Sequence, residues 1–219
     1  MNTQLDIDRS GVQVLAMSTG TMELLVDPAT HARTGLSVVL HPQPLMGGSA
    51  RHKVPDYLAK GLVANGWTTL RPNFRGVGQS TGVHGEGHGE REDVLGLLHT
   101  LRQQHPGERI ALVGFSFGAF VAACVAKALI DAGQPAWRVC LVGMPFGAVA
   151  GGRHYDTPMN LSDAMVVHGE LDERVPLTSV MAWARPATQP VVVVPGADHF
   201  FTGRLPTLRA LVLRHLQPN

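Results

Sequence analysis

The chain has 219 residues with 18 basic and 17 acidic side chains, a balance that gives no field to attract nucleic acid or an anionic membrane surface. Its length fits a single α/β domain over residues 1–219. The first fifteen residues lack a leader pattern, and no apolar run approaches the ~18 residues of a membrane span. Both cysteines lie in apolar runs, so we expect no disulfide and a soluble, cytoplasmic protein.

Short apolar runs rich in β-branched residues recur along the chain and predict eight strands. The first two runs are separated by a few residues, which predicts an antiparallel hairpin. The runs cover residues 11–17, 21–27, 35–41, 67–73, 109–115, 138–144, 163–169 and 190–196.

From Leu36 onward these runs alternate with helix-like segments. Such alternation predicts right-handed crossovers and a mostly parallel sheet with helices on both faces. The run VVVV at 191–194 is typical of a strand buried on both sides. The predicted helices cover residues 54–64, 90–104, 117–132, about 178–184, and 203–216.

Ligands of open parallel sheets bind outside the carboxyl ends of the strands, so the residues after each run are the first candidates for a site. GFSFG, at 114–118, stands between a strand-like run and an Ala-rich helix-like run. This context predicts a sharp turn that exposes the Ser116 hydroxyl as a nucleophile. The alternative is a tight strand-to-helix turn without chemistry, for which Gly114 and Gly118 would also be needed.

A serine hydroxyl needs a neighbouring base, and His199 follows the last predicted strand in the segment GADHFF. Asp172, in VVHGELDERVP, follows an earlier strand and is our candidate for the acid that orients this histidine. Three other acids compete with Asp172. Glu170 and Glu173 fit solvated loop charges, and Asp198 is adjacent to the histidine in sequence and badly placed to bond its ring.

An acyl-transfer site also needs N–H donors for the oxyanion. One candidate is the backbone N–H of Phe117, at the start of the predicted helix, where the helix dipole is positive. The second should come from HPQP, at 41–44, where both prolines lack an N–H. Gln43 is therefore the candidate there, with Leu45 as the alternative.

Six ordered blocks of sequence resemble small bacterial α/β-hydrolase superfamily proteins related to dienelactone hydrolases and short serine esterases. The resemblance runs from about residue 36 to about residue 205, and it implies the α/β-hydrolase fold and a triad of Ser116, Asp172 and His199. The blocks are HPQPLMGG, RPNFRGVGQSTG, GEGHGERED, GFSFGAFVAA, HGELDERVP and ADHFFTGRL.

Within the block NFRGVGQS, the resemblance suggests that Arg75 braces loops beneath the site. Asn73 stands where many relatives carry an aspartate. The glycine-spaced segment 84–90 holds two histidines and two glutamates, but we interpret it as a flexible polar loop and predict no metal. The sequence contains neither the phosphate-binding pattern Gly-x-x-x-x-Gly-Lys-Ser/Thr nor the dinucleotide-binding pattern Gly-x-Gly-x-x-Gly after a first strand. We therefore expect no cofactor.

The stretch 145–162, where larger relatives carry a lid, is short and rich in glycine and proline. We therefore predict no cap domain and an open cleft. Each apolar candidate for its wall is equally compatible with ordinary core. The candidates are Leu45, Phe115, Phe117, Met144, Phe146, Tyr155, Phe200 and Phe201.

These features predict a serine hydrolase that cleaves a small or medium ester or thioester, a small-molecule partner, through an acyl-enzyme. A serine peptidase or an acyltransferase would use the same triad. A non-catalytic binding protein that keeps the fold is the alternative from another class. The sequence makes no prediction of oligomeric state.

Overall fold

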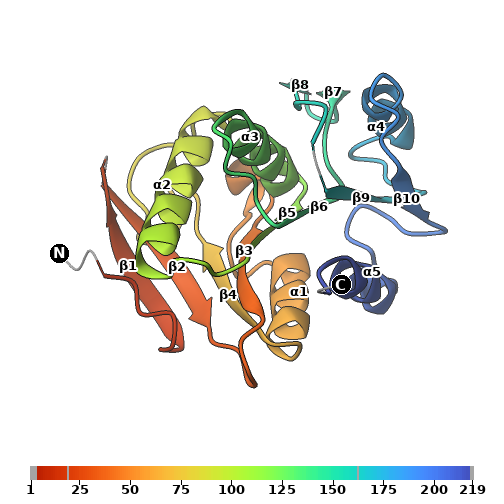
Figure 1. Cartoon of the computed structure of the whole chain (residues 1–219). Helices are drawn as coiled ribbons and strands as arrows, with labels where there is room; N and C mark the ends of the chain where they lie inside the picture. The colour runs from red at the N-terminus through yellow and green to blue at the C-terminus, as the bar shows by residue number, and fades with distance from the viewer. Residues whose placement is uncertain (1–3, 19, 162, 218–219) are drawn as a thin grey trace.

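The computed structural model describes residues 4–18, 20–161 and 163–217. Over these ranges the main sheet has eight strands in the order β1-β2-β4-β3-β5-β6-β9-β10 (Figure 1). β1 pairs antiparallel with β2, and β2 with β4, whereas the other neighbours are parallel. The strands are β1 Gly11–Met17, β2 Gly20–Asp27, β3 Gly35–Leu40, β4 Trp67–Pro72, β5 Ile110–Phe115, β6 Arg138–Val142, β9 Ala164–Gly169 and β10 Val191–Val194. The predicted mostly parallel sheet with an N-terminal hairpin is confirmed.

Helices cover both faces of this sheet. In Figure 1, α2, α3 and α4 lie on one side, and α1 and α5 on the other. Two separate clusters of buried apolar residues match this division. The helices are α1 Lys53–Val63, α2 His88–Gln104, α3 Phe117–Asp131, α4 Leu177–Ala184 and α5 Leu205–His215. Each begins and ends within two residues of its prediction.

The central strands β3, β4 and β5 are buried at every position. A strand that is covered on both faces has no solvent side, which is why these runs show no alternation of buried and exposed positions. α3 presents small side chains to the sheet, and nine of its residues are buried. Alanine is the strongest helix former, and its small side chain lets this helix lie close to β5 and β6.

The segment after β6 contains a small hairpin that the sequence did not predict. β7, Gly147–Val149, pairs antiparallel with β8, Arg153–Tyr155. Strands of three residues in a glycine-rich stretch carry no detectable alternation. Residues 145–161 form no helix, in accordance with the expected absence of a cap domain.

Cys124 lies on α3 and Cys140 on β6, and both are free thiols. Within the described ranges, no helix has both the length and the apolar character that a membrane crossing requires. Residues 1–3, which begin the segment without a leader pattern, lie outside the described residues.

The sheet order explains where a site can form. β3 lies between β4 and β5. After β3 the chain continues to β4 on one side, and it later returns to form β5 on the other side of β3. The loop after β3 and the turn after β5 therefore meet at the same edge of the sheet. This arrangement is the usual position of ligand sites in open α/β sheets.

Candidate functional site

Ser116 forms the turn between β5 and α3, with φ of 56° and ψ of −122°. A positive φ is rare for a residue with a side chain, and such backbone strain persists only where the surroundings hold it. The Ser116 N–H donates to the Val142 carbonyl at 2.8 Å, and its own carbonyl accepts the Ala119 N–H at 2.8 Å. These bonds fix the half-buried hydroxyl above the sheet edge.

The two glycines that flank this turn are required by close backbone approach. A Cβ on Gly114 would lie 2.4 Å from the Gly118 carbonyl oxygen, and a Cβ on Gly118 would lie 2.4 Å from the Leu40 carbonyl oxygen. Both obstacles are backbone atoms, which cannot move aside as a flexible side chain does. GFSFG therefore packs the start of α3 directly against the end of β3.

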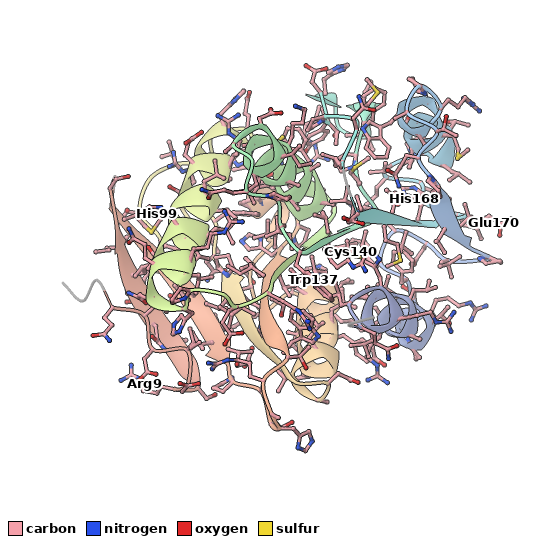
Figure 2. The ribbon with its side chains drawn as sticks, viewed as in Figure 1. Arg9, His99, Trp137, Cys140, His168 and Glu170 are labelled. Atoms are coloured by element: carbon pink, nitrogen blue, oxygen red, sulfur yellow. The ribbon has the colours of Figure 1, made fainter. Side chains whose placement is uncertain are left out.

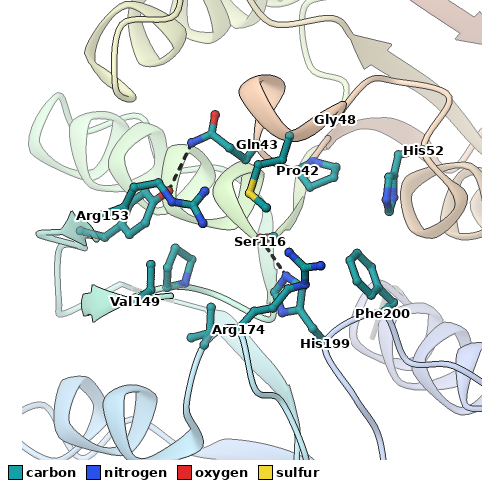
Figure 3. A pocket seen from close by; sticks show the side chains of 14 residues that line it. Pro42, Gln43, Gly48, His52, Ser116, Val149, Arg153, Arg174, His199 and Phe200 are labelled. Atoms are coloured by element: carbon teal, nitrogen blue, oxygen red, sulfur yellow. Dashed lines mark hydrogen bonds between the residues drawn. The ribbon is translucent and has the colours of Figure 1, made fainter. Parts of the chain in front are cut away.

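His199, in the loop after β10, contacts the serine directly. Its Nε2 lies 3.0 Å from the Ser116 Oγ (Figure 3), and its Nδ1 lies 2.7 Å from Asp172 Oδ2. A carboxylate only accepts hydrogen bonds, so Nδ1 carries the proton of the neutral ring. The Nε2 lone pair is then free to accept the serine proton.

The Asp172 carboxylate is fully buried at the end of the turn after β9. Its Oδ1 accepts the backbone N–H groups of Arg174 at 2.9 Å and Val175 at 2.8 Å, and its Oδ2 faces His199. These three hydrogen bonds fix the orientation of both carboxylate oxygens.

The three competing acids lie elsewhere. Glu170 accepts the Gly196 N–H, and Asp198 accepts the Thr202 N–H. Glu173 is exposed. Among the described residues the structure therefore brings only Asp172, of the four acids that the sequence offered, to the His199 ring.

A second buried histidine, His168 on β9 (Figure 2), lies behind the acid and was not predicted. Its Nε2 is 2.9 Å from the Val175 carbonyl oxygen and 3.5 Å from Asp172 Oδ2. The carbonyl accepts, so Nε2 carries the proton, and burial lowers the pKa of this ring. His168 therefore packs against Asp172 as a neutral ring. Its place inside a continuous apolar run concealed it in the sequence.

The two predicted N–H donors are the backbone groups of Phe117, next to Ser116, and of Gln43, which lines the same cavity as Ser116. Those of Phe117 and Gln43 have no acceptor within the described part of the chain. The Leu45 N–H, our alternative, instead points to the Gln43 side-chain oxygen at 3.4 Å. Phe117 is the first residue of α3, where a helix leaves its N–H groups free.

His41 anchors the loop that carries Gln43. Its Nε2 accepts the Phe74 N–H at 3.0 Å, so its Nδ1 must donate to the Pro42 carbonyl at 2.7 Å. Burial lowers the pKa of His41 to about 3, which keeps the ring neutral. A fixed neutral ring thus ties residues 41–43 to the loop after β4.

A cavity of about 130 Å³ opens in front of Ser116 and His199. Of the predicted wall residues, Tyr155 and Phe200 line it, and Phe200 is labelled in Figure 3. Leu45 and Phe117 line an adjoining hollow of about 340 Å³, which shares Gln43, Arg153 and Tyr155 with the first. Leu45 is 74% exposed.

The other predicted wall residues lie away from this cavity. Met144 is fully buried in the apolar cluster on the α2–α4 face, and Phe146 packs against the same cluster. Both follow β6, and the position after a strand does not decide the direction of a side chain. Phe115 and Phe201 are buried in the cluster on the opposite face. Phe115 lies 5.2 Å from the His199 ring and supports it from below.

The loops around the site are braced rather than free. Arg75 forms two 2.8 Å hydrogen bonds with Asp93, which agrees with its expected supporting role.

The segment 84–90, which we expected to be a flexible loop, folds around the buried carboxylate of Glu90. Glu90 accepts from the N–H groups of Gly85 and Gly87 at 2.9 Å and contacts His84 at 2.8 Å. Among the described residues, no group of three His, Cys, Asp or Glu side chains is placed to hold a metal ion.

Three further cavity residues were missed in the sequence. His52, before α1, lies 5.8 Å from the rings of both Phe115 and Phe200. Arg153 comes from β8 and Arg174 from the loop after β9. Single basic residues in loops or three-residue strands have no periodic signal, so only the fold brings them to Ser116.

Comparison with known proteins places this arrangement in a family. The family model described as alpha/beta hydrolase fold matches residues 37–129. An alpha-beta serine hydrolase homologue from Coxiella burnetii is 33% identical, with a TM-score of 0.82 over 94% of this chain and 97% of that chain. XC6422 from Xanthomonas campestris, a serine hydrolase without lid, is 30% identical, with a TM-score of 0.81 over 94% and 93% of the two chains.

A curated relative, the uncharacterized protein RP471 of Rickettsia prowazekii, is 43% identical over 104 residues. That alignment covers 47% of this chain and 44% of the relative, so the match spans about half of each. The structures from Coxiella burnetii and Xanthomonas campestris match more than nine-tenths of both chains, at 33% and 30% identity. The chain therefore belongs to the α/β-hydrolase superfamily.

Proposed function

We propose that the protein is a serine hydrolase that cleaves a carboxylic ester or thioester of a small to medium acyl group. The observation that carries this proposal is the hydrogen-bonded series from Asp172 through His199 to the strained Ser116. This series supplies an oriented general base beside a half-buried hydroxyl that lines the cavity, as nucleophilic catalysis requires.

In the first half-reaction the Ser116 Oγ attacks the carbonyl carbon as its proton passes to His199 Nε2. The buried Asp172 carboxylate stabilises the imidazolium that forms. The Gln43 and Phe117 N–H groups donate to the oxyanion of the tetrahedral intermediate. His199 then gives its proton to the leaving alcohol or thiol, and the acyl group stays on Ser116.

In the second half-reaction a water molecule attacks the acyl-enzyme. His199 takes one water proton, and the second tetrahedral intermediate uses the same two N–H donors. Collapse of this intermediate returns the proton to Ser116 and releases the carboxylic acid. The overall balance is ester plus water to acid plus alcohol, or thioester plus water to acid plus thiol.

The size of the cavity favours short acyl groups. A volume of about 130 Å³ in front of Ser116 holds only a few carbon atoms, and the adjoining hollow behind Gln43 and Tyr155 offers further space. These two residues contact each other, with the Gln43 amide nitrogen 3.4 Å from the Tyr155 hydroxyl. A longer chain would have to displace this contact.

A series of p-nitrophenyl esters from acetate to decanoate, with acyl thioesters beside it, tests the proposal. We expect hydrolysis of the short members with a burst of p-nitrophenol at high enzyme concentration, because the acyl-enzyme forms before it is hydrolysed. Ser116→Ala should abolish the burst and lower kcat by about 10⁴-fold or more. Equal turnover by the folded Ser116→Ala protein would contradict the proposal.

A further inference from the structure

Among the described residues that line the cavity in front of Ser116, two are arginines and none is an acid; Glu86 lines only the adjoining hollow. Arg153 and Arg174 supply the fixed charge. The Asp172 carboxylate is fully buried behind His199, and its two oxygens are occupied by the bonds described above. It therefore offers no neutralising partner to the arginines at the mouth.

Neither arginine makes an ion pair within the described ranges. Arg153 donates through Nη2 to the Ala150 carbonyl at 2.9 Å. The Arg174 guanidinium lies 5.0 Å from the centre of the Phe200 ring. Each guanidinium has five N–H donors, so most of the donors of both remain available. Arg75, beside the same loops, is by contrast paired in full with Asp93.

Both arginines are held by the fold rather than by long free loops. Arg153 lies in β8, opposite Val149 of β7, and both residues line the cavity. The backbone N–H of Arg174 donates to the Asp172 carboxylate, and this bond fixes the backbone of Arg174 beside the acid of the site. Figure 3 shows the two side chains reaching toward the pocket beside Ser116, from different segments of the chain.

Two histidines also line the cavity, the general base His199 and His52, and the latter is neutral at pH 7. Burial and the neighbouring His199 lower the pKa of His52, so its ring becomes charged only in acid. The fixed charge that a ligand meets at neutral pH is therefore that of the two guanidinium groups. Guanidinium groups match carboxylates with paired, parallel hydrogen bonds.

We propose that the substrate carries a carboxylate on its acyl group, so that it is a half-ester or half-thioester of a short dicarboxylic acid. This inference rests on the proposed hydrolase function and names its substrate class. The cavity of about 130 Å³ suits a spacer of a few carbons between the scissile carbonyl and the carboxylate. Arg153 and Arg174 bind the carboxylate, Ser116 attacks the ester carbonyl, and water releases a dicarboxylic acid and an alcohol or thiol.

The test compares two esters of equal chain length, monoethyl glutarate and ethyl pentanoate, by pH-stat titration. The wild-type protein should prefer the half-ester by about tenfold or more in kcat/KM, as expected for a charge-assisted hydrogen bond. Arg153→Gln and Arg174→Gln should each lower this preference about tenfold, whereas the charge-preserving Arg→Lys variants should retain part of it. Arg214→Gln, an exposed arginine on α5, is the matched control and should leave the preference unchanged.

The same variants separate this inference from the proposed function. If the arginines only stabilised the oxyanion, both esters would lose activity equally and the preference would stay constant, which would overturn the inference. Calorimetric titration of monoethyl glutarate into Ser116→Ala supplies the second readout, with loss of binding expected when Arg153→Gln is added. Binding without turnover in the wild type would contradict the hydrolase and support the anion site. Turnover without a preference for the half-ester would support the hydrolase and contradict the anion site.

Discussion

Asp172 contacts His199 through one carboxylate oxygen, at 2.7 Å, and binds two backbone N–H groups through the other. The acid is therefore fixed by its own turn before it meets the histidine. Glu173, the next residue, is exposed. Two neighbouring acids on one turn thus have different environments, and this difference makes the acid of the site testable.

Asp172→Asn should lower kcat by about 10³- to 10⁴-fold, because an amide in this position favours the wrong histidine tautomer. Glu173→Gln removes a charge one residue away and should change kcat less than twofold. Steady-state hydrolysis of p-nitrophenyl acetate by the two variants measures both effects. A similar loss of kcat in the two variants would mean that activity depends on the total negative charge of this loop and not on the bond between Asp172 and His199.

Gly118→Ala should destabilise the protein by about 1–3 kcal/mol or prevent folding, because the new Cβ would overlap the Leu40 carbonyl oxygen. Gly96→Ala is the matched control, inside α2. Its new Cβ meets only the Met17 Cε, at 2.8 Å, which is the flexible end of a side chain. There the helix preference for alanine should stabilise by about 0.5–1 kcal/mol. Urea unfolding compares the two, and equal effects would contradict the close approach of α3 to β3.

Stability should fall in acid through His41. Its pKa is about 3 in the folded protein, against an ordinary value of 6.5, so between these values the unfolded chain binds a proton that the folded one does not. One such group lowers the free energy of unfolding by about 1.4 kcal/mol for each pH unit below 6.5.

His41→Gln should remove that contribution, since glutamine does not titrate. The variant will be less stable at pH 7, but its free energy of unfolding should decline less steeply from pH 6 to pH 4. His168, which is also buried, acts equally in both proteins and cancels in the comparison. Parallel slopes would show that the folded protein accepts a proton on His41.

Neither cysteine should react in the folded protein. Burial raises the pKa of Cys124 to about 11 and that of Cys140 to about 12, so almost no thiolate is present at pH 8. Iodoacetamide at pH 8 should leave both thiols intact for hours and modify both within minutes in 8 M urea, as intact-mass spectrometry will record. Rapid modification of the native protein would mean that α3 or β6 opens.

The sequence was most informative where chemistry and chain geometry coincide. GFSFG between a strand and a helix located Ser116, and the prolines around Gln43 left one N–H donor in that turn. Strand ends also placed Asp172 and His199 on one edge, because parallel strands share a direction.

The walls of the cavity were harder to predict, because they depend on side-chain direction. Met144 follows β6 as expected, yet it turns into the core. Arg153 enters through a hairpin of three-residue strands, and no periodicity marks strands of that length. His168 lies in an apolar run, where its contact with Asp172 arises only from the turn that follows β9.

The most direct test of the central claim is to label the protein with a fluorophosphonate and to map the modified residue by peptide mass spectrometry. Such a probe reacts with a serine only when a neighbouring base activates it. We expect one label per chain, on Ser116, and none on the folded Ser116→Ala protein. Absence of labelling on the folded wild-type protein, or a label that persists in Ser116→Ala, would contradict the account.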